Sequence, residues 1–356
     1  MKLIYLLFFF SAPLSAENPE SFRVGVILPL SGPLAEYGVA TRNGIQMALH
    51  EKPQAFSHIK FIYEDDQYDN KKTVAAFNKL QAVDSADLVY VWGSGPSSAV
   101  APIADKNKFP LIAMAIDPAP AIGRNSVIRF ANYSGQYVDV LLNYLRAHKL
   151  RNFGVVVTQI AYTESMLDAL RKRLSKDETL TILHSLNPGD SDFKASVLKI
   201  KNTKVDALGV YLMSRQLVPF YRELRSHKIT TATFGTDFFE SKTEIQNSGG
   251  LMSGAVYPNN VVQQWFSDKY IGQFANDIQI TFAANGYDFA RLLSELFPVN
   301  QGTVSPQDII KQFESTSKRD GASGVFHFSN SDEGGKFFDF PIVMREIISQ
   351  DIRTLN

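Results

Sequence analysis

The chain has 356 residues, 45% of them hydrophobic, and is therefore long enough to bury the cores of about two domains. Its 36 basic residues equal its 36 acidic residues in number, which excludes the strongly basic field that attracts nucleic acid or anionic lipid. Because the chain contains no cysteine, disulfide bonds and cysteine-based metal or redox chemistry are excluded as well.

The first sixteen residues have the pattern of a secretory signal peptide. Lys2 supplies a positive charge, residues 3–10 are apolar, and the sequence Pro-Leu-Ser-Ala at 13–16 forms a cleavage site before Glu17. The alternative, a membrane anchor, requires an apolar run of about 20 residues, which this segment does not reach. We therefore expect export to a Gram-negative periplasm. Without a cysteine at the cleavage site, the exported protein should not be a lipoprotein.

The first element after this segment is a βα unit. The apolar run at 24–28 is typical of a buried strand, the Ser-Gly-Pro sequence at 31–33 ends it, and the spacing of Ile45, Ala48 and Leu49 indicates a helix. Open α/β sheets bind ligands in the loops at the carboxyl ends of their parallel strands. Tyr37, the large amphipathic side chain of this loop, is therefore a candidate ligand contact.

Strands and helices then alternate with little interruption, which predicts an α/β fold with two doubly wound parallel sheets and a ligand cleft between them. The segment 128–137, with its Asn-Tyr-Ser-Gly turn cluster, is predicted to connect the two lobes. Predicted strands cover 59–64, 87–92, 110–114, 153–158, 179–185, 206–212 and 233–235. Predicted helices cover 71–82, 136–148, 164–175, 193–201, 216–227, 263–275, 282–296 and 306–315, followed by a hairpin at 324–344. We predict that residues 22–132 and 259–330 form lobe 1, and residues 133–258 and 331–356 form lobe 2.

A loop rich in glycine and serine, residues 93–98, follows the strand at 87–92 and precedes a helical run at 99–106. The N–H groups of a helix start, with the Ser97 hydroxyl, could bind a carboxylate or phosphate. The alternative is that Ser97 is an ordinary helix cap, because serine is a preferred cap whatever the loop binds. Gly93, Gly95 and Ser98 nearly match a dinucleotide-binding fingerprint, with Asp117 about 20 residues further on, but the third glycine is missing.

No catalytic motif stands out. The chain has no Gly-x-Ser-x-Gly sequence and no histidine pair at metal-binding spacing. The acidic run at 64–66 with Asp69 is better explained as a solvated strand end than as a cation site. We therefore expect neither an enzyme nor a bound metal or cofactor.

Four motifs together resemble those of a known family. Residues 30–38, 63–66, 93–98 (with Pro102 and Asp105) and 235–237 occur in the order and spacing seen in the leucine/isoleucine/valine-binding proteins of ABC transporters. The resemblance covers residues 22–287. It implies the fold of type I periplasmic binding proteins, in which two α/β lobes joined by three crossovers close on a ligand in the manner of a Venus flytrap.

The resemblance also implies a ligand-binding site. Its residues are Tyr37, Ser97, Ala115, Asp117, Tyr162 and Asp237. In the family, the equivalent of Ser97 binds the ligand carboxylate with help from backbone groups at 115 and 117, the equivalent of Asp237 binds the ammonium group, and the tyrosines line the cleft. These roles are physically reasonable because a buried zwitterion needs donors at one end and a carboxylate at the other. Without the resemblance, Asp237 could be a capping residue and Tyr162 a packing residue.

The chain departs from the family pattern at several positions. Asp117 stands where relatives commonly have Thr, so either the ligand is not a simple branched-chain amino acid, or the Asp117 carboxylate turns away and caps a backbone turn near Pro118. Met213 replaces a frequent aromatic residue, and Tyr68 and Pro96 occupy the positions of the family's disulfide.

The expected function is that of a periplasmic solute-binding component of an ABC importer. Its ligand would be an amino acid or a related small amino or carboxylic compound, its protein partner an ABC transporter permease, and the protein a monomer that binds no nucleic acid. An alternative is a sensory module that passes its ligand to a receptor, since the same fold serves both roles. A dinucleotide-binding enzyme is the less favoured alternative.

Overall fold

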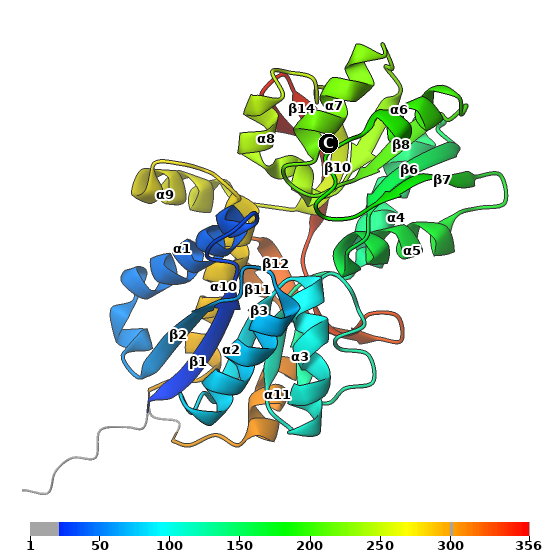
Figure 1. Ribbon diagram of the computed structural model, residues 1–356. Coiled ribbons are helices and arrows are strands. Elements are labelled where there is room, and N and C mark those ends of the chain that lie inside the picture. Colours follow the sequence, from blue (N-terminus) through cyan, green and yellow to red (C-terminus); the bar gives the residue numbers. More distant parts are fainter. Residues whose placement is uncertain (1–20, 300–301, 356) are drawn as a thin grey trace, which may run out of the picture.

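The computed structural model describes residues 21–299 and 302–355, which form two lobes, each built around one sheet (Figure 1). We define the first lobe as the sheet containing β1 with the helices packed on it, and the second lobe as the sheet containing β6 with its helices. The predicted signal peptide at 1–16 lies outside the described residues. Within the described ranges, no helix is long and apolar enough to cross a bilayer.

The first sheet has the strand order β11-β12-β13-β5-β4-β3-β1-β2. The strands from β13 to β2 pair in parallel, whereas β12 is antiparallel to both of its neighbours. The strands are β1 (Phe22–Leu28), β2 (Ile59–Asp65), β3 (Leu88–Trp92), β4 (Leu111–Met114), β5 (Val127–Arg129), β11 (Arg319–Gly321), β12 (Gly324–Ser331) and β13 (Gly335–Asp339).

Two glycines allow the longest helices of this lobe to pack closely. A Cβ atom on Gly44 of α1 would lie 1.9 Å from the backbone oxygen of Ala283 in α10, and one on Gly286 of α10 would lie 2.3 Å from the backbone oxygen of Thr41. The close approach therefore depends on glycine at both positions. The helices of the first lobe are α1 (Ala35–Glu51), η1 (Pro53–Phe56), α2 (Asn70–Ala82), α3 (Ser94–Lys106), α9 (Gln264–Phe274), α10 (Ile280–Leu296) and α11 (Pro306–Glu314).

The second sheet has the order β15-β14-β10-β9-β8-β6-β7, with a parallel centre and an antiparallel edge formed by β14 and β15. Its strands are β6 (Asn152–Thr158), β7 (Thr179–Leu186), β8 (Ala207–Tyr211), β9 (Ala232–Gly235), β10 (Val256–Asn260), β14 (Ile342–Ile348) and β15 (Asp351–Thr354). Its helices are α4 (Ser134–Ala147), α5 (Ala161–Arg173), α6 (Lys194–Lys201), α7 (Leu217–Ser226), η2 (Asp237–Glu240) and α8 (Lys242–Asn247).

Sheet pairing corrects two of the predicted lobe boundaries. The boundary at 258/259 falls inside β10, which pairs with β9 and β14 of the second sheet. The boundary at 330/331 falls inside β12, and β13 still belongs to the first sheet through its pairing with β5. The chain therefore crosses between the sheets at 130–133, 261–263 and 340–341. The boundary at 330/331 was predicted wrongly because the sequence pattern of a hairpin does not reveal which sheet the hairpin joins.

A buried polar network ties the three crossovers together. The Asn132 Nδ2 group donates to Asp339 Oδ1 at 3.0 Å and to the Phe340 carbonyl oxygen at 3.1 Å. The Asn260 Nδ2 group donates to Asn132 Oδ1 at 2.7 Å, and the Tyr137 hydroxyl donates to Asn260 Oδ1 at the same distance. Because residues in or next to each crossover belong to one connected network, the region that joins the lobes has a defined geometry.

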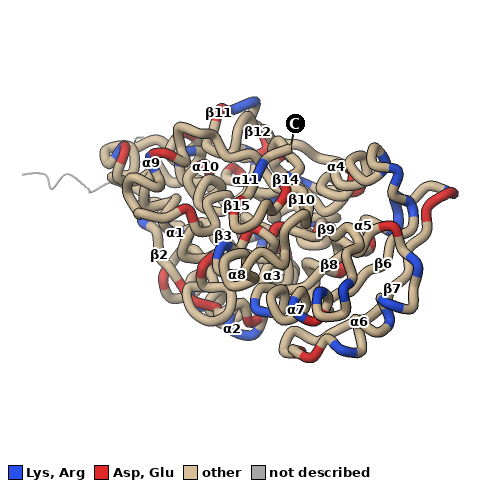
Figure 2. Tube along the Cα trace, turned by 90° about the horizontal axis from the view of Figure 1, so that it is seen from above, with Lys and Arg blue, Asp and Glu red and all other residues tan. Residues whose placement is uncertain are grey.

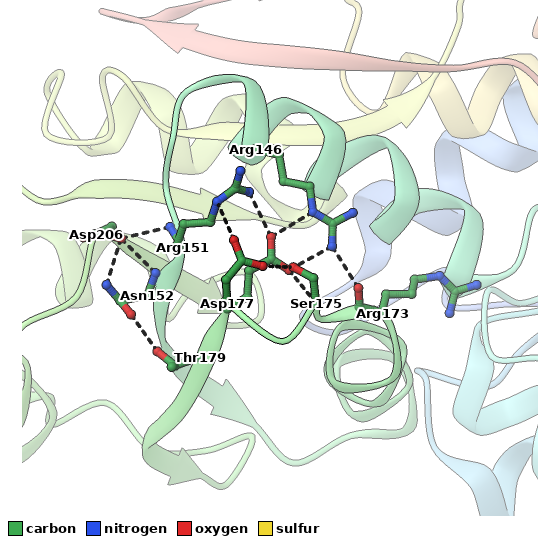
Figure 3. Close-up of polar contacts among 9 residues, drawn as sticks. Arg146, Arg151, Asn152, Arg173, Ser175, Asp177, Thr179 and Asp206 are labelled. Carbon is green, nitrogen blue, oxygen red and sulfur yellow. Dashed lines mark hydrogen bonds and ion pairs between the residues drawn. The ribbon is translucent and has the colours of Figure 1, made fainter.

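The outer end of the second lobe contains a cluster of ion pairs around Glu178. Figure 2 shows several Lys and Arg residues along β7, α6 and the nearby loops, with acidic residues among them. The Glu178 side chain has no exposed surface and accepts from Arg146 Nε at 2.8 Å and Arg151 Nη1 at 3.1 Å. Figure 3 shows these two arginines converging on the acidic residues from the end of α4 and the start of β6. Arg146 and Arg151 therefore fix local structure.

Candidate ligand-binding site

A cavity of about 650 Å³ lies between the lobes. It is formed by loops and helix starts that follow parallel strands of both sheets, where open α/β sheets bind ligands. The first lobe contributes Pro33, Leu34, Gln67, Tyr68, Asp69, Asn70, Lys71 and Gly95. The second lobe contributes Gln159, Ile160, Ala161, Glu164, Pro188 and Met213.

Tyr37 spans the gap between the lobes. It lies in the first turn of α1, and only 1% of its surface is exposed. Its hydroxyl forms a 2.9 Å hydrogen bond with the Ser214 hydroxyl of the second lobe, and its ring meets the Phe238 ring edge-on at 5.7 Å. Burial raises the pKa of Tyr37, so this hydroxyl is a neutral hydrogen-bonding group at physiological pH.

Aromatic rings form a continuous band from the first lobe to the second, and its first member, Tyr68, lines the cavity. The centroid of Tyr68 lies 5.7 Å from that of Trp92, and Trp92 lies 5.5 Å from Tyr37. In the second lobe, Phe238 lies 5.1 Å from Tyr162. We refer to these five residues, Tyr37, Tyr68, Trp92, Phe238 and Tyr162, as the aromatic band. Contacts at these distances stabilise aromatic pairs beyond the area they bury.

Asp237 lies at the second-lobe end of this band. It is the first residue of η2, directly beyond β9, and its carboxylate accepts a hydrogen bond from the Tyr162 hydroxyl. Its pKa is raised to about 7, chiefly by desolvation and to a smaller extent by the nearby Glu240, while the Tyr162 hydrogen bond opposes this shift. Within the described part of the chain, no Lys or Arg side chain forms an ion pair with Asp237. A carboxylate held in this way has an unmet preference for a cation.

Ser97 does not face the cavity. The helix α3 begins at Ser94, earlier than the predicted run at 99–106, so Ser97 lies in its first turn. Its N–H donates to the Gly93 carbonyl oxygen at 3.0 Å, and its fully buried hydroxyl donates to the Val91 carbonyl oxygen at 3.4 Å. Both groups of Ser97 thus have partners within the first lobe, and a ligand contact from Ser97 stays a prediction.

The loop after β4 is also satisfied internally. The Ala115 carbonyl oxygen accepts from Arg129 Nη1 at 3.1 Å. The Asp117 N–H donates to Ser94 Oγ at 3.3 Å, while Asp117 Oδ1 accepts from the Ala119 N–H at 3.1 Å. Asp117 Oδ1 thus caps the turn at Pro118, as the second of the two expectations describes, and its part in ligand binding stays a prediction. Burial nevertheless raises the pKa of this carboxyl group.

The structure thus brings together Tyr37, Tyr162 and Asp237, and it holds Ser97, Ala115 and Asp117 in contacts within the first lobe. Sequence reasoning did not select Tyr68, Trp92 or Phe238 as site residues. Their positions at the ends of β2, β3 and β9 were the available signal, because those ends meet at one edge of each sheet.

Residues 21–337 match the family described as periplasmic binding protein. The chain belongs to this family. A periplasmic binding protein binds a solute, so the prediction of a binding protein rather than an enzyme is confirmed, as is the predicted resemblance.

Curated relatives carry related names. The chain is 30% identical over 224 residues to the Leu/Ile/Val-binding protein BraC3 of Rhizobium johnstonii, a match that covers 58% of this chain and 59% of that relative. It is 25% identical over 290 residues to an amino acid binding protein of Pseudomonas aeruginosa, with 77% of this chain and 75% of that relative covered. The chain thus spans about three fifths of the length of the first relative.

Solved structures confirm the predicted fold. The leucine binding protein LivK of Thermotoga maritima superimposes with a TM-score of 0.84 at 18% identity, covering 94% of this chain and 97% of that one. The LivJ protein of Streptococcus pneumoniae, in complex with isoleucine, gives a TM-score of 0.81 at 18% identity, covering 94% and 99%. A solute binding protein of Rhodopseudomonas palustris in complex with benzoate gives 0.79 at 18% identity, covering 94% and 95%.

Proposed function

We propose that this periplasmic binding protein is the solute-binding component of an ABC importer and that it carries a small compound with an amino group. The observation that carries this proposal is Asp237, a carboxylate without a cationic partner among the described residues, set at the end of an inter-lobe aromatic band. A buried carboxylate without a partner is costly, and a ligand ammonium group removes that cost.

The relatives suggest two ligand classes, since their names refer to branched-chain amino acids and to benzoate. A benzoate carries a negative charge and no ammonium group. Placed near Asp237, it would meet repulsion rather than compensation. The electrostatics of the site therefore favour a ligand with an amino group over an aromatic acid.

Closure of the two lobes around the ligand is the proposed binding motion. Tyr37 of the first lobe already contacts Ser214 and Phe238 of the second, so a ligand in the cavity would be enclosed by surfaces from both. Periplasmic binding proteins are among the standard examples of domain closure about a hinge. The permease partner, the periplasmic location and the monomeric state are parts of the same proposal.

A thermal-shift screen over amino acids, amides, amines and aromatic acids tests the proposal. A ligand present at 100 times its Kd stabilises the native state by about 2.7 kcal/mol, which is readily seen as a rise in Tm. The matched control is Asp237→Asn, which keeps the size of the side chain but removes its charge. Stabilisation by an amino compound that persists unchanged in Asp237→Asn would contradict the assigned role of Asp237.

A further inference from the structure

The segment 237–243 follows β9 in the second lobe and carries Asp237 at its start. It comprises η2, one linking residue and the first two residues of α8. Its Phe238 ring packs edge-on against Tyr37 of the first lobe. Two further contacts, both polar, join the same short segment to the first lobe.

These polar contacts pair Glu240 and Lys242 with residues around the start of α10. The Thr281 hydroxyl donates to Glu240 Oε1 at 2.6 Å, and both residues are buried. Lys242 Nζ lies 2.5 Å from Oδ2 of Asp277, in the loop between α9 and α10, and both side chains are about one-third exposed. None of these four residues belongs to the described residues that line the cavity. The contact between the lobes therefore extends beyond the surface that faces a ligand.

Glu240 is fixed within the second lobe by a buried ion pair. It is 3% exposed, and its partner, Arg345 of β14, is 7% exposed. The Asn259 Nδ2 group of β10 also donates to Glu240, and Arg345 Nη2 donates to the carbonyl oxygen of Asn260, at the second crossover. Because separating a buried pair leaves a charge uncompensated, η2 cannot leave β10 and β14 without a large cost in free energy. The segment 237–243 therefore moves with the second lobe.

Thr281 is fixed within the first lobe by helix packing. It is the second residue of α10, which lies against α1 at the close approach over Gly44 and Gly286. Tyr37 lies in the first turn of α1. Thr281 and Tyr37 thus belong to one packed pair of helices. Because packed surfaces move as units, their contacts with the segment 237–243 form together when the lobes close and break together when they open.

We infer that the segment 237–243 couples the ligand site to lobe closure, and that Glu240 is the positioning residue whose buried ion pair fixes Asp237 relative to Thr281. The inference rests on the proposed function, in which a ligand occupies the cleft beside Asp237. A ligand held between the lobes brings the two packed surfaces together. The apparent affinity is proportional to the fraction of molecules that can close, so the contacts of Thr281 and Lys242 strengthen binding without touching the ligand.

Thr281 allows the sharpest test, because Thr281→Val keeps the shape of the side chain and removes the hydroxyl, whereas Thr281→Ser keeps the hydroxyl. Substitution of Glu240 is less suitable, since it leaves the Arg345 charge buried and can prevent folding. Thr281→Val should lower the ratio of closed to open molecules, and with it the affinity, about tenfold. Thr281→Ser should change both by about twofold at most.

Spin labels on Val83→Cys in the first lobe and Leu198→Cys in the second measure this ratio, because both positions are exposed. The distance distribution is recorded without any added compound and then with L-leucine at rising concentration. A distribution for Thr281→Val that equals that of wild type at every concentration would overturn the inference. So would an equal loss in Thr281→Ser, because the hydroxyl would then not be the cause. A lower Tm with an unchanged ratio would show that Thr281 is only structural.

The exposed end of the contact gives a second test. Lys242→Gln should lower the closed-to-open ratio about two- to fivefold at low salt, the range of a partly exposed ion pair. The difference from wild type should vanish in about 1 M NaCl, where the Debye length is about 3 Å. The matched control is Lys336→Gln, since Lys336 pairs with Glu314 at 2.7 Å inside the first lobe. An equal effect of Lys336→Gln would show a general response to charge and would remove Lys242 from the coupling segment.

The outcomes also separate this inference from the proposed function. If L-leucine leaves the wild-type distribution unchanged while Thr281→Val still shifts the distribution recorded without any compound, the coupling stands and the ligand assignment alone is wrong. If L-leucine closes wild type and Thr281→Val at the same concentrations, the proposed function stands and the coupling is wrong.

Discussion

Arg173, the last residue of α5 in the second lobe, forms a bidentate ion pair with Glu333 in the turn between β12 and β13 of the first lobe. The Nη1 atom lies 2.7 Å from Oε1, and Nη2 lies 2.8 Å from Oε2. Arg173 Nε also donates to Asp139 at 2.8 Å, and Figure 3 shows the side chain pointing away from the Arg146 cluster. Since the start of α5 lines the cavity, both ends of this helix meet the first lobe.

Breaking this pair should favour opening of the lobes. Arg173→Glu places two carboxylates together, and the swapped double variant Arg173→Glu with Glu333→Arg should restore closure. A partly exposed pair contributes up to about 1 kcal/mol, which corresponds to about a fivefold change in the ratio of closed to open molecules. Because the chain has no cysteine, spin labels can be placed on Val83→Cys and Leu198→Cys, at exposed positions of the two lobes.

The distance distribution between these labels measures the lobe equilibrium without any ligand. Arg171→Glu is the matched control, since Arg171 pairs with Asp168 inside α5 and that pair does not join the lobes. A distribution that is the same in wild type, Arg173→Glu and the control would show that the Arg173 pair does not hold the lobes together.

The ion pair between Glu178 and Arg146 should affect the stability of the folded protein rather than its affinity for ligand. Its hydrogen bonds with Arg146 lower the pKa of Glu178 to about 2, although burial opposes this shift. A carboxylate with a depressed pKa stabilises the folded state above its unfolded pKa, and that contribution is lost as pH falls from about 4.5 towards 2.

Glu178→Gln removes this contribution. We expect a loss of about 1.5 to 3 kcal/mol at pH 7, the range of hydrogen bonds to charged groups, with ligand affinity unchanged. Urea unfolding at pH 7 and pH 3 measures it, and the difference between the variants should shrink at the lower pH. An equal difference at both values of pH would mean that the charge of Glu178 is not what stabilises the lobe.

Asp117→Asn should leave ligand ranking unchanged. The amide oxygen of Asn can still accept the Ala119 N–H, so the turn remains capped, whereas Asp117→Ala removes the cap and should cost about 1 kcal/mol of stability. A thermal-shift comparison of both variants over the same compounds checks this. A new preference for neutral aliphatic amino acids in Asp117→Asn would show instead that Asp117 contacts the ligand.

The elements and the fold could be predicted because apolar periodicity and turn residues are local signals. The start of α3 could not, because Ser94, Gly95 and Pro96 have the pattern of a loop, although proline is well tolerated in the first turn of a helix. Because α3 begins at Ser94, Ser97 lies within the helix, and its buried hydroxyl bonds the Val91 carbonyl oxygen. The contact of the Tyr68 ring with Gly93 joins segments after two different strands, and nothing in the local sequence specifies it. Asp237, in contrast, closely follows the end of β9, and Tyr37 lies at the start of the helix that follows β1.

Asp237 gives the last prediction, that ligand affinity depends on pH. Its pKa of about 7 in the free protein means that part of the population is protonated near neutrality, and an amine ligand binds the charged form. Binding should therefore tighten as pH rises from 6 to 8 and should release a proton, which appears as a buffer-dependent heat in calorimetry. In the free protein, the raised pKa has the opposite consequence: the folded state holds a proton that the unfolded state releases, so stability falls as pH rises from about 3.8 towards 7.

Asp288 provides the comparison, because burial also raises its pKa to about 7. It accepts hydrogen bonds from the N–H groups of Ala322 at 2.6 Å and Ser323 at 2.7 Å, so its role is structural. Asp237→Asn should flatten the dependence of affinity on pH and weaken binding by about two decades or more, since it removes the partner of a buried ammonium group. Asp288→Asn should alter only the dependence of Tm on pH. If the affinity profile of wild type is already flat between pH 6 and 8, Asp237 is not the group that pairs with the ligand.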